Sequence, residues 1–305
     1  EEGEKRPRLD EEVLEKRRQR RLWEQRRQKL LFDYTQFSYY SNSTAILFYE
    51  LSWKLSKDSN ELLWWAIVGE TQLYISEKIE QDQYLMVTAS LQNHVSRLNH
   101  KSQDEKPLDS IKISFDKELS LVLYRHWTLV ESMRHSPYLA SSFKLWTLKG
   151  EKKMHELLAE IGLPLVECKQ NYSSMDMTLR SEIPELLEGK AEKYGLVNLL
   201  YASFSLSHGF RNKFSASDYV FATSGLLEFP EKGNTDTDNF LTASDSFNLS
   251  NIYMLERGIE CSKLQFEAIY RQVTTFLNMN QVISAGPFLY ATVLQGSPDG
   301  GFFSS

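Results

Sequence analysis

The residue types that most often perform catalysis are scattered along this chain of 305 residues and form no recognisable motif. Two of its six histidines, His94 and His100, stand six positions apart, which does not place two metal ligands on one helical face. We find no glycine-rich loop followed by Lys-Ser/Thr, no dinucleotide fingerprint, no His-Glu-x-x-His pair and no Gly-x-Ser-x-Gly turn. We therefore expect no catalytic residue, no bound metal and no cofactor.

A dense run of positive charge near the start of the chain is the strongest candidate for binding a polyanion. Only Glu15 and Glu24 interrupt it, and the residues around them are strong helix formers. One interpretation is a nuclear import signal or a helix that contacts the DNA backbone. The other is a solvated helix in which these glutamates pair with neighbouring arginines. The basic residues are Lys16, Arg17, Arg18, Arg20, Arg21, Arg26, Arg27 and Lys29.

Aromatic residues follow this run at residues 31–40, which read LFDYTQFSYY. Beside a basic helix they would suit a platform on which the bases of single-stranded nucleic acid stack. The alternative is that they pack the entry to the first core helix, which is the commoner use of such side chains. A simple single-strand binder is therefore one function that the sequence leaves open.

Length and composition describe a protein that needs no disulfide or metal to fold. A chain of 305 residues holds about two domains. Its two cysteines, Cys168 and Cys261, are too few for a disulfide framework, which favours a reducing intracellular compartment. The net charge of −6 argues that any contact with nucleic acid is local. The longest apolar run, residues 62–68, is far shorter than the roughly 20 residues that span a bilayer, so we expect a soluble protein without membrane contact.

Residues 43–72 form the densest apolar stretch and predict two buried helices joined by a turn. Asp58, followed three residues later by Glu61, predicts a capping box that starts the second helix. Burial of Trp64 and Trp65 there would contribute on the order of 4–6 kcal/mol each before ordering costs. In the first helix, apolar residues at three- and four-residue steps indicate one core-facing side. These residues are Ala45, Leu47, Phe48, Leu51 and Leu55.

The middle of the chain reads as mostly helical. A β-branched alternation at residues 111–115 predicts one short strand, and residues 119–133 turn helical after it. We see little other strand signal in this part of the chain.

The last third adds one cap, one long helix and a small sheet. Ser215-x-x-Asp218 fits a capping box in front of an apolar helix, which makes Asp218 a cap in preference to a catalytic acid. Residues 239–279 predict a long helix that Gly258 bends or divides. Residues 282–299 predict two strands around a tight corner.

Several long phrases of the sequence resemble the cell division control protein 45 family of eukaryotic replication factors. They include LFDY, LSK-x-x-N-x-LLWWAIVG, HVSR-x-NH, LVLY-x-HW, FKLW, GLPL, KF-x-ASD-x-VFAT and GPFLY. Phrases of this length and specificity do not arise by chance, and they extend over nearly the whole chain but only the middle of the family's length. The chain also lacks an initiator Met, which fits a piece cut from a longer protein. The resembling stretches are residues 31–40, 43–72, 91–100, 121–133, 143–165, 208–223 and 282–299.

This resemblance implies a relative of RecJ-type phosphoesterases with a mixed, predominantly α fold. The chain would hold the helical second half of a RecJ-like DHH α/β domain, a helical inter-domain section and the start of a DHHA1-type α/β domain. The implied divisions are a basic linker or helix at 1–30, the DHH-like helices at 31–105, a partner-binding section at 106–235, and a linking helix with the first strands of a truncated DHHA1-like domain at 236–305.

The resemblance also implies that a metal-binding position is degenerate. In active relatives an Asp shortly after the glycine of the segment matching residues 64–72 helps to hold the catalytic metal. The matching position here is Gln72, and Glu70 is the only acid nearby. A neutral carboxamide does not supply the anionic oxygen that hard cations require, so the resemblance implies no working two-metal site.

Members of the family act as a non-catalytic part of the replicative helicase. The resemblance therefore implies a nuclear scaffold and activator that joins the minichromosome maintenance ring to the GINS complex. Chromatin, single-stranded DNA and replication-origin loading factors are its other implied partners. A divergent metal-dependent single-strand exonuclease or phosphoesterase and the simple single-strand binder described above are the alternatives.

Within this scaffold, residues 111–195 are the expected partner-binding element. Two places in it mix aromatic with basic residues, the composition that interface anchors favour. The alternative is that Trp127 and Trp146 are ordinary core residues. The predicted interface residues are Arg125, His126, Trp127, Phe143, Lys144 and Trp146.

Overall fold

The structure is a computed structural model that describes residues 11–36, 42–101, 111–208, 212–228, 235–248, 251–285 and 288–292. The chain divides into two compact units, Glu1–Asn42 and Ser43–Ser305. Helices dominate the described residues, and the strands form one sheet of three and one of two. No helix among the described residues is long and apolar enough to cross a membrane.

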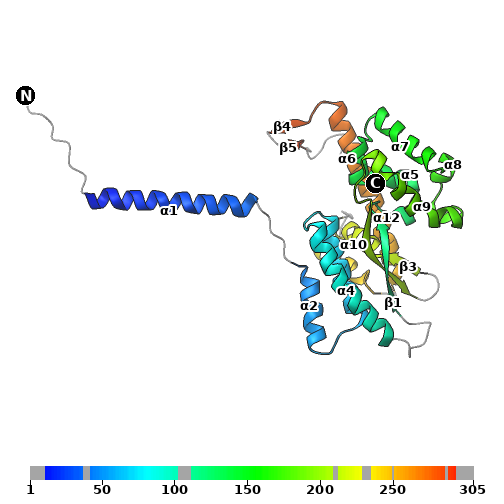
Figure 1. Cartoon of the computed structure of the whole chain (residues 1–305), viewed down its shortest axis with the longest axis horizontal. Helices are drawn as coiled ribbons and strands as arrows, with labels where there is room; N and C mark the ends of the chain where they lie inside the picture. Colours follow the sequence, from blue (N-terminus) through cyan, green and yellow to red (C-terminus); the bar gives the residue numbers. More distant parts are fainter. Residues whose placement is uncertain are drawn as a thin grey trace, which may run out of the picture. The chain divides into compact units, whose positions relative to one another are not determined.

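The first unit is built on one helix, α1 (Glu11–Gln36), drawn in blue in Figure 1. Every side chain from Lys16 to Asp33 is exposed, so this helix has no buried face within its unit. Its Arg, Glu, Gln, Lys and Leu residues favour a helix without tertiary packing. The expected pairing of a glutamate with a neighbouring arginine is present, because Arg20 Nε lies 3.1 Å from Glu24 Oε1.

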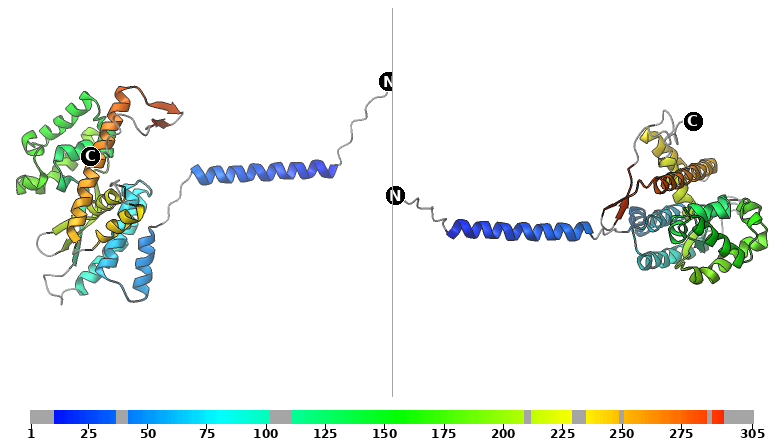
Figure 2. Two further views of the ribbon diagram at one scale, coloured as in Figure 1. Left: turned by 180° about the vertical axis from the view of Figure 1, so that it is seen from behind. Right: turned by 90° about the horizontal axis from the view of Figure 1, so that it is seen from above.

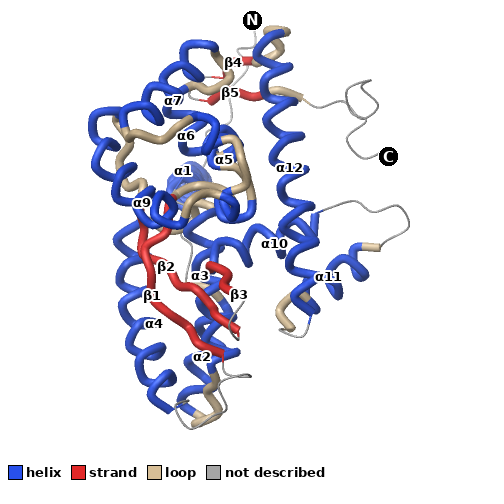
Figure 3. Tube along the Cα trace, turned by 90° about the vertical axis from the view of Figure 1, so that its right-hand side faces the viewer, coloured by secondary structure: helices blue, strands red, loops and turns tan. Residues whose placement is uncertain are grey.

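The second unit contains an antiparallel sheet of order β1-β2-β3 covered by helices, which we call the sheet lobe. Ile111 of β1 faces His208 of β2, Leu119 faces Leu200, and β3 pairs on the other side of β2. Helices α3 and α4 contact both long strands, and Figure 3 shows α4 beside β1. The elements are α2 (Thr44–Lys54), α3 (Asn60–Ile75), α4 (Gln81–Lys101), β1 (Ile111–Leu119), β2 (Leu200–His208), β3 (Asn212–Ser215) and α10 (Ala216–Glu228).

The chain between β1 and β2 forms a second group of short helices around its own core, which we call the helical lobe. Leu129, Met133, Met154 and Leu157 are fully buried in that core. The elements are η2 (Tyr124–His126), α5 (Leu129–His135), α6 (Pro137–Phe143), α7 (Leu148–Glu160), α8 (Leu165–Cys168), η3 (Tyr172–Ser174), α9 (Met177–Ala191) and η4 (Glu192–Tyr194). They are the green helices of Figure 1.

One long helix, α12 (Ile252–Asn278), connects the two lobes of the second unit. It packs along α10 of the sheet lobe and also contacts α5 of the helical lobe, and Figure 2 shows it running past both. The helix α11 (Asp236–Asp245) precedes it. The two strands expected after it are confirmed as the antiparallel pair β4 (Ile283–Ala285) and β5 (Phe288–Tyr290).

Two sequence predictions for the middle of the chain are wrong. Residues 119–133 do not form one helix, since β1 runs to Leu119, the helical turn η2 covers only Tyr124–His126, and α5 starts at Leu129. The strand β2 was not expected, although Phe204 and Leu206 alternate with serines in the two-residue period of a strand. Five of the nine residues from Leu200 to His208 are buried and none is exposed, so both sides of β2 pack.

The prediction of one long helix over residues 239–279 is also wrong. The helix is interrupted between Ser246, the C-cap of α11, and Asn251, the N-cap of α12. Gly258 does not divide it, because Gly258 lies buried inside α12 where this helix crosses α10. The glycine therefore permits close helix packing instead of a bend.

The core-facing side of α2 is the opposite of the predicted one. Ile46 and Tyr49 are buried, and they point to the other side of the helix from the expected residues. Phe48 is the most exposed of the predicted set, with 67% of its surface accessible. Trp64 of α3 is buried as predicted at 3% exposure, but Trp65 is 42% exposed, so the second tryptophan contributes much less than full burial would.

The start of α3 also differs from the predicted capping box. Ser59 is the N-cap, and its Oγ accepts a hydrogen bond of 3.2 Å from the Leu62 amide. The Asp58 carboxylate instead forms an ion pair of 2.6 Å with Arg97 of α4. A charge-assisted pair is stronger than a single bond to an amide, so the carboxylate goes to the guanidinium and the hydroxyl caps the helix.

Candidate functional site

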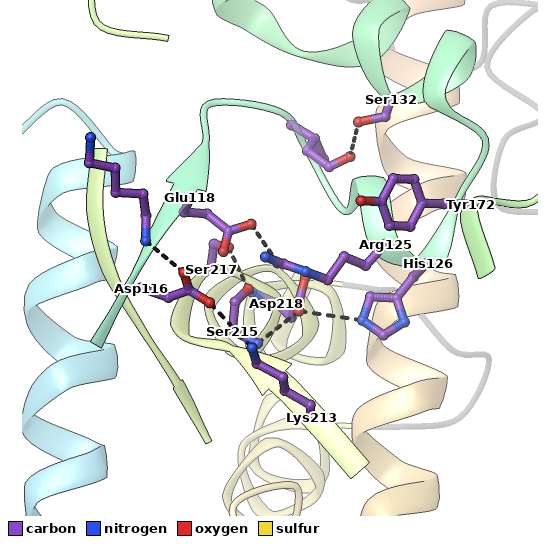
Figure 4. A network of polar contacts seen from close by, with 12 residues as sticks. Asp116, Glu118, Arg125, His126, Ser132, Tyr172, Lys213, Ser215, Ser217 and Asp218 are labelled. Atoms are coloured by element: carbon purple, nitrogen blue, oxygen red, sulfur yellow. Dashed lines mark hydrogen bonds and ion pairs between the residues drawn. The ribbon is translucent and has the colours of Figure 1, made fainter. Parts of the chain in front are cut away.

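Arg125 and His126, two of the predicted interface residues, belong to an ion network inside the second unit. Arg125 Nη1 lies 2.5 Å from Glu118 Oε1, and His126 Nε2 lies 3.4 Å from Asp218 Oδ2. Both carboxylate side chains are only 3% exposed. Figure 4 shows the Arg125 and His126 side chains of η2 pointing toward the carboxylates at the end of β1 and the start of α10. The network therefore links the first turn of the helical lobe to the sheet lobe.

Asp218 is held in this network by the local fold of its own helix. Its Oδ2 accepts a 2.9 Å hydrogen bond from the Ser215 amide, and its own amide donates to Ser215 Oγ at 3.2 Å. The predicted capping box is thus confirmed. Burial opposes ionisation of Asp218, but His126, Arg125 and the Ser215 amide outweigh it and hold the pKa of this carboxyl below its ordinary value.

Glu118, which the sequence did not single out, is the second acid of the network. Burial raises its pKa to about 7, although the Arg125 guanidinium acts in the opposite direction. The Arg125 guanidinium also lies over the Tyr124 ring at 4.5 Å. Arg125 supplies a cation between the two acids, and the arrangement stabilises the junction between the lobes.

The other predicted interface residues are divided between the core and the surface. Trp127 is buried and stacks on His135 with ring centres 4.8 Å apart. Phe143 is buried as well, whereas Lys144 is exposed and Trp146 is half-buried. The structure therefore half-buries Arg125 and His126 and buries Trp127, and it leaves the second aromatic-basic group partly at the surface. The interface itself stays a prediction.

Gln72, the predicted degenerate ligand, lies on α3 with its carboxamide engaged by its own helix. Its Nε2 donates to Ser76 Oγ at 3.2 Å in the next turn. The nearby acid Glu70 is buried, and its Oε2 accepts a 3.3 Å hydrogen bond from the Ser43 amide at the start of α2. Burial raises the pKa of Glu70, with the Ser43 hydrogen bonds opposing the shift. Among the described residues, no three His, Cys, Asp or Glu side chains are grouped so that they could hold a metal ion.

A cavity of about 530 Å³ lies where the end of α3 meets β1, α6 and α12. Its described lining is mainly aromatic and aliphatic and includes Tyr74, Tyr138 and Tyr201. Glu77 is the one carboxylate among these lining residues. One carboxylate is too few for the paired acids of a two-metal hydrolase, so this cavity suits an apolar group better than a phosphoester.

The eight basic residues of the predicted polyanion site all lie on α1, and all eight side chains are exposed. The guanidinium of Arg27 lies 5.6 Å from the centre of the Trp23 ring. Of the aromatic residues expected to stack bases, Phe32 is exposed. Residues 37–40 lie outside the described residues.

Comparison with known proteins gives the relationship of the whole chain. The model of the family described as CDC45 matches residues 1–305. The chain is 46% identical to the cell division control protein 45 homolog of Homo sapiens over 99% of its length, and 33% identical to that of Schizosaccharomyces pombe over 94%. It covers 54% and 50% of these two proteins, so it spans about half the length of the curated relatives that it matches.

The crystal structure of CDC45 from Entamoeba histolytica has a similar fold, with a TM-score of 0.67 at 24% sequence identity. The match covers 79% of this chain and 48% of that one, and it confirms the predominantly α, RecJ-like fold class. The family expected from the sequence phrases is thereby confirmed. The chain belongs to the CDC45 family of cell division control proteins, and this membership implies a role in DNA replication and the cell cycle.

Proposed function

We propose that this chain forms part of a non-catalytic scaffold and activator of the eukaryotic replicative DNA helicase. In this proposal it works in the nucleus, joins the minichromosome maintenance ring to the GINS complex and touches single-stranded DNA on chromatin. The observation that carries the non-catalytic part is Gln72, whose neutral carboxamide stands where the resemblance expects an anionic ligand and bonds to Ser76 of the same helix.

In the helical lobe, residues 144–148 join the end of α6 to the first residue of α7. The contacts of this surface segment make it suited to docking. Lys144 is the left-handed C-cap of α6, and Thr147 is the N-cap of α7. Leu145 is buried between them, and its carbonyl accepts a 3.2 Å hydrogen bond from the Tyr270 hydroxyl of α12. Gly150 permits the close approach, because a Cβ there would collide with the Lys144 carbonyl.

This anchoring fixes three outward side chains in the 144–148 segment. Lys144 is exposed, Trp146 is half-buried and Leu148 is 81% exposed. A surface that is already ordered loses little conformational entropy when a partner binds, so each contact contributes more to affinity. We therefore propose this segment, instead of the Arg125 group that is engaged at the lobe junction, as the part of the predicted interface that meets the helicase ring or GINS.

The test replaces the exposed side chains and leaves the anchor intact. Trp146→Ala with Leu148→Ala should reduce co-purification of the full-length protein with the helicase ring and GINS at least tenfold. Val166→Ala, which truncates another exposed apolar residue of the same lobe, is the matched control and should change nothing. Melting temperatures separate binding from folding. A variant pair that folds normally and still binds both partners would refute the proposed segment.

The competing function is a divergent metal-dependent exonuclease, and one observation favours it. Glu70 Oε1 is buried near Gln72 without a hydrogen-bond partner. A nuclease assay of the full-length protein on single-stranded DNA with added Mn²⁺ distinguishes the two functions. Nuclease turnover by the wild type that disappears in Glu70→Gln would overturn the non-catalytic proposal. No turnover by either the wild type or the variant would support the non-catalytic proposal.

A further inference from the structure

The charges of α1 surround the helix instead of lying on one side. Successive residues of an α-helix point about 100° apart around its axis. Lys16, Arg20 and Arg27 therefore point within about 40° of one another, and we call them the front triad. Trp23 lies beside them and is 59% exposed, with the Arg27 guanidinium over its ring.

A second set of three basic residues points the opposite way. Arg18, Arg21 and Lys29 fall within about 80° of one another, and the middle of this back triad is roughly 170° from the middle of the front triad. All of these side chains are exposed. Between residues 16 and 29 the only acid is Glu24, and its carboxylate is engaged by Arg20.

Two opposite basic faces on one helix are complementary to a partner that carries negative charge on both sides of the helix. The flat acidic surface of a protein or a membrane meets one face of a helix and leaves the other in solvent. A single DNA strand likewise follows one side of a helix. The major groove of duplex DNA is about 12 Å wide, and an α-helix with its side chains is about 10–12 Å across. A helix in that groove has phosphates of both strands along its flanks.

We propose that α1 binds double-stranded DNA by lying in the major groove, with the front triad on the phosphates of one strand and the back triad on those of the other. The contacts are to phosphates, so they position the helix without selecting a sequence. Six arginines among the eight basic residues suit this role, because the guanidinium fork binds phosphate oxygens in pairs. This inference goes beyond the proposed helicase scaffold and does not depend on it.

Two triple variants with the same loss of charge on opposite faces test the proposal. One carries Lys16→Gln, Arg20→Gln and Arg27→Gln, and the other carries Arg18→Gln, Arg21→Gln and Lys29→Gln. Glutamine keeps the helix, since its helix propensity is close to that of Lys and Arg. The matched control changes three exposed lysines of the second unit, with Lys149→Gln, Lys152→Gln and Lys169→Gln. Fluorescence anisotropy of the whole chain is measured with a labelled duplex and with a single strand of the same length, at several salt concentrations.

The wild type should bind the duplex at least tenfold more tightly than the single strand. Each triad variant should reduce the slope of log affinity against log salt by about 2.7, because each neutralised phosphate of duplex DNA contributes about 0.9. The lysine control should keep the wild-type slope. Equal affinity for the two DNA forms, a loss confined to one triad, or an equal loss in the control would each overturn the groove arrangement. A one-sided loss would show instead that the DNA lies along one face of the helix. Co-purification with the helicase ring, measured on the same variants, reports separately on the scaffold function.

Discussion

The crossing of α10 and α12 should be sensitive to one added methyl group. Gly225 of α10 lies against α12 so closely that a Cβ would sit 2.6 Å from the Gly258 carbonyl oxygen and 2.9 Å from the Ser262 amide nitrogen. Both atoms belong to the backbone, so no side-chain rotation relieves the collision. The Ser262 hydroxyl, which donates to the Phe221 carbonyl, would also be displaced.

The size of the effect follows from two opposing contributions. Overpacking a buried site costs about 1–3 kcal/mol, and collision with two backbone atoms places Gly225→Ala at the upper end of that range. Replacing an interior helical glycine by alanine returns about 1 kcal/mol of helix propensity. We therefore expect Gly225→Ala to lower the free energy of unfolding by about 2 kcal/mol.

Gly189 of α9 is the matched control, because it is helical, exposed and has nothing within 4 Å of an added Cβ. Gly189→Ala should therefore raise the free energy of unfolding, by up to about 1 kcal/mol. Urea denaturation of both variants measures the two signs in one experiment. If Gly225→Ala were as stable as the wild type, the helices would have to be separable at no cost, and the role assigned to close packing at this crossing would be wrong.

Three further predictions concern polar groups. Glu118 has a pKa of about 7 in the folded protein, above its ordinary value of 4.5. Its contribution to stability is therefore complete below about pH 4.5 and is lost as pH rises through 7. The urea midpoint should fall between pH 5 and pH 8, and it should fall more steeply in the wild type than in Glu118→Gln. The pKa of Asp218 is lowered instead, so its contribution is present at neutral pH and lost in acid; Asp218→Asn should flatten the acid limb of the same measurement. Ser59→Ala should cost about 1 kcal/mol of unfolding free energy through loss of the α3 cap, and an unchanged urea midpoint would return the cap to Asp58.

The case of α2 shows how far hydrophobic periodicity predicts a fold. The sequence gives a helix of the right length, but two apolar stripes share it, one with Ile46 and Tyr49 and one with Leu47, Phe48 and Leu51. Periodicity alone favours the stripe with more residues. The fold buries the other one, because Tyr49 and Ile46 meet α3 and α4 across the helix layer. That choice depends on contacts far apart in sequence, which a local pattern does not contain.

Composition was a similarly limited guide to the predicted interface. Aromatic residues next to basic residues mark protein interfaces, but the same mixture satisfies carboxylates inside a protein. Arg125 and His126 meet Glu118 and Asp218, and Asp218 comes from a helix far along the chain. No local pattern predicts the pairing of His126 with Asp218, because it forms only when η2 and α10 meet in the fold.

Lys144 is exposed at the surface, whereas Arg125 is half-buried and paired with Glu118. Among the described residues no ion pair or hydrogen bond engages the Lys144 ammonium, and Lys144 is exposed at the end of α6. Its left-handed backbone, at φ 56°, is uncommon for a residue with a side chain and is held in place by the packing of Gly150 and Leu145. The fold thus holds Lys144 in an uncommon conformation at the surface, next to an aromatic residue. Such a fixed surface position is better evidence for docking than aromatic and basic composition alone. The Arg125 group thus belongs to the lobe junction, and the 144–148 segment is the proposed partner surface.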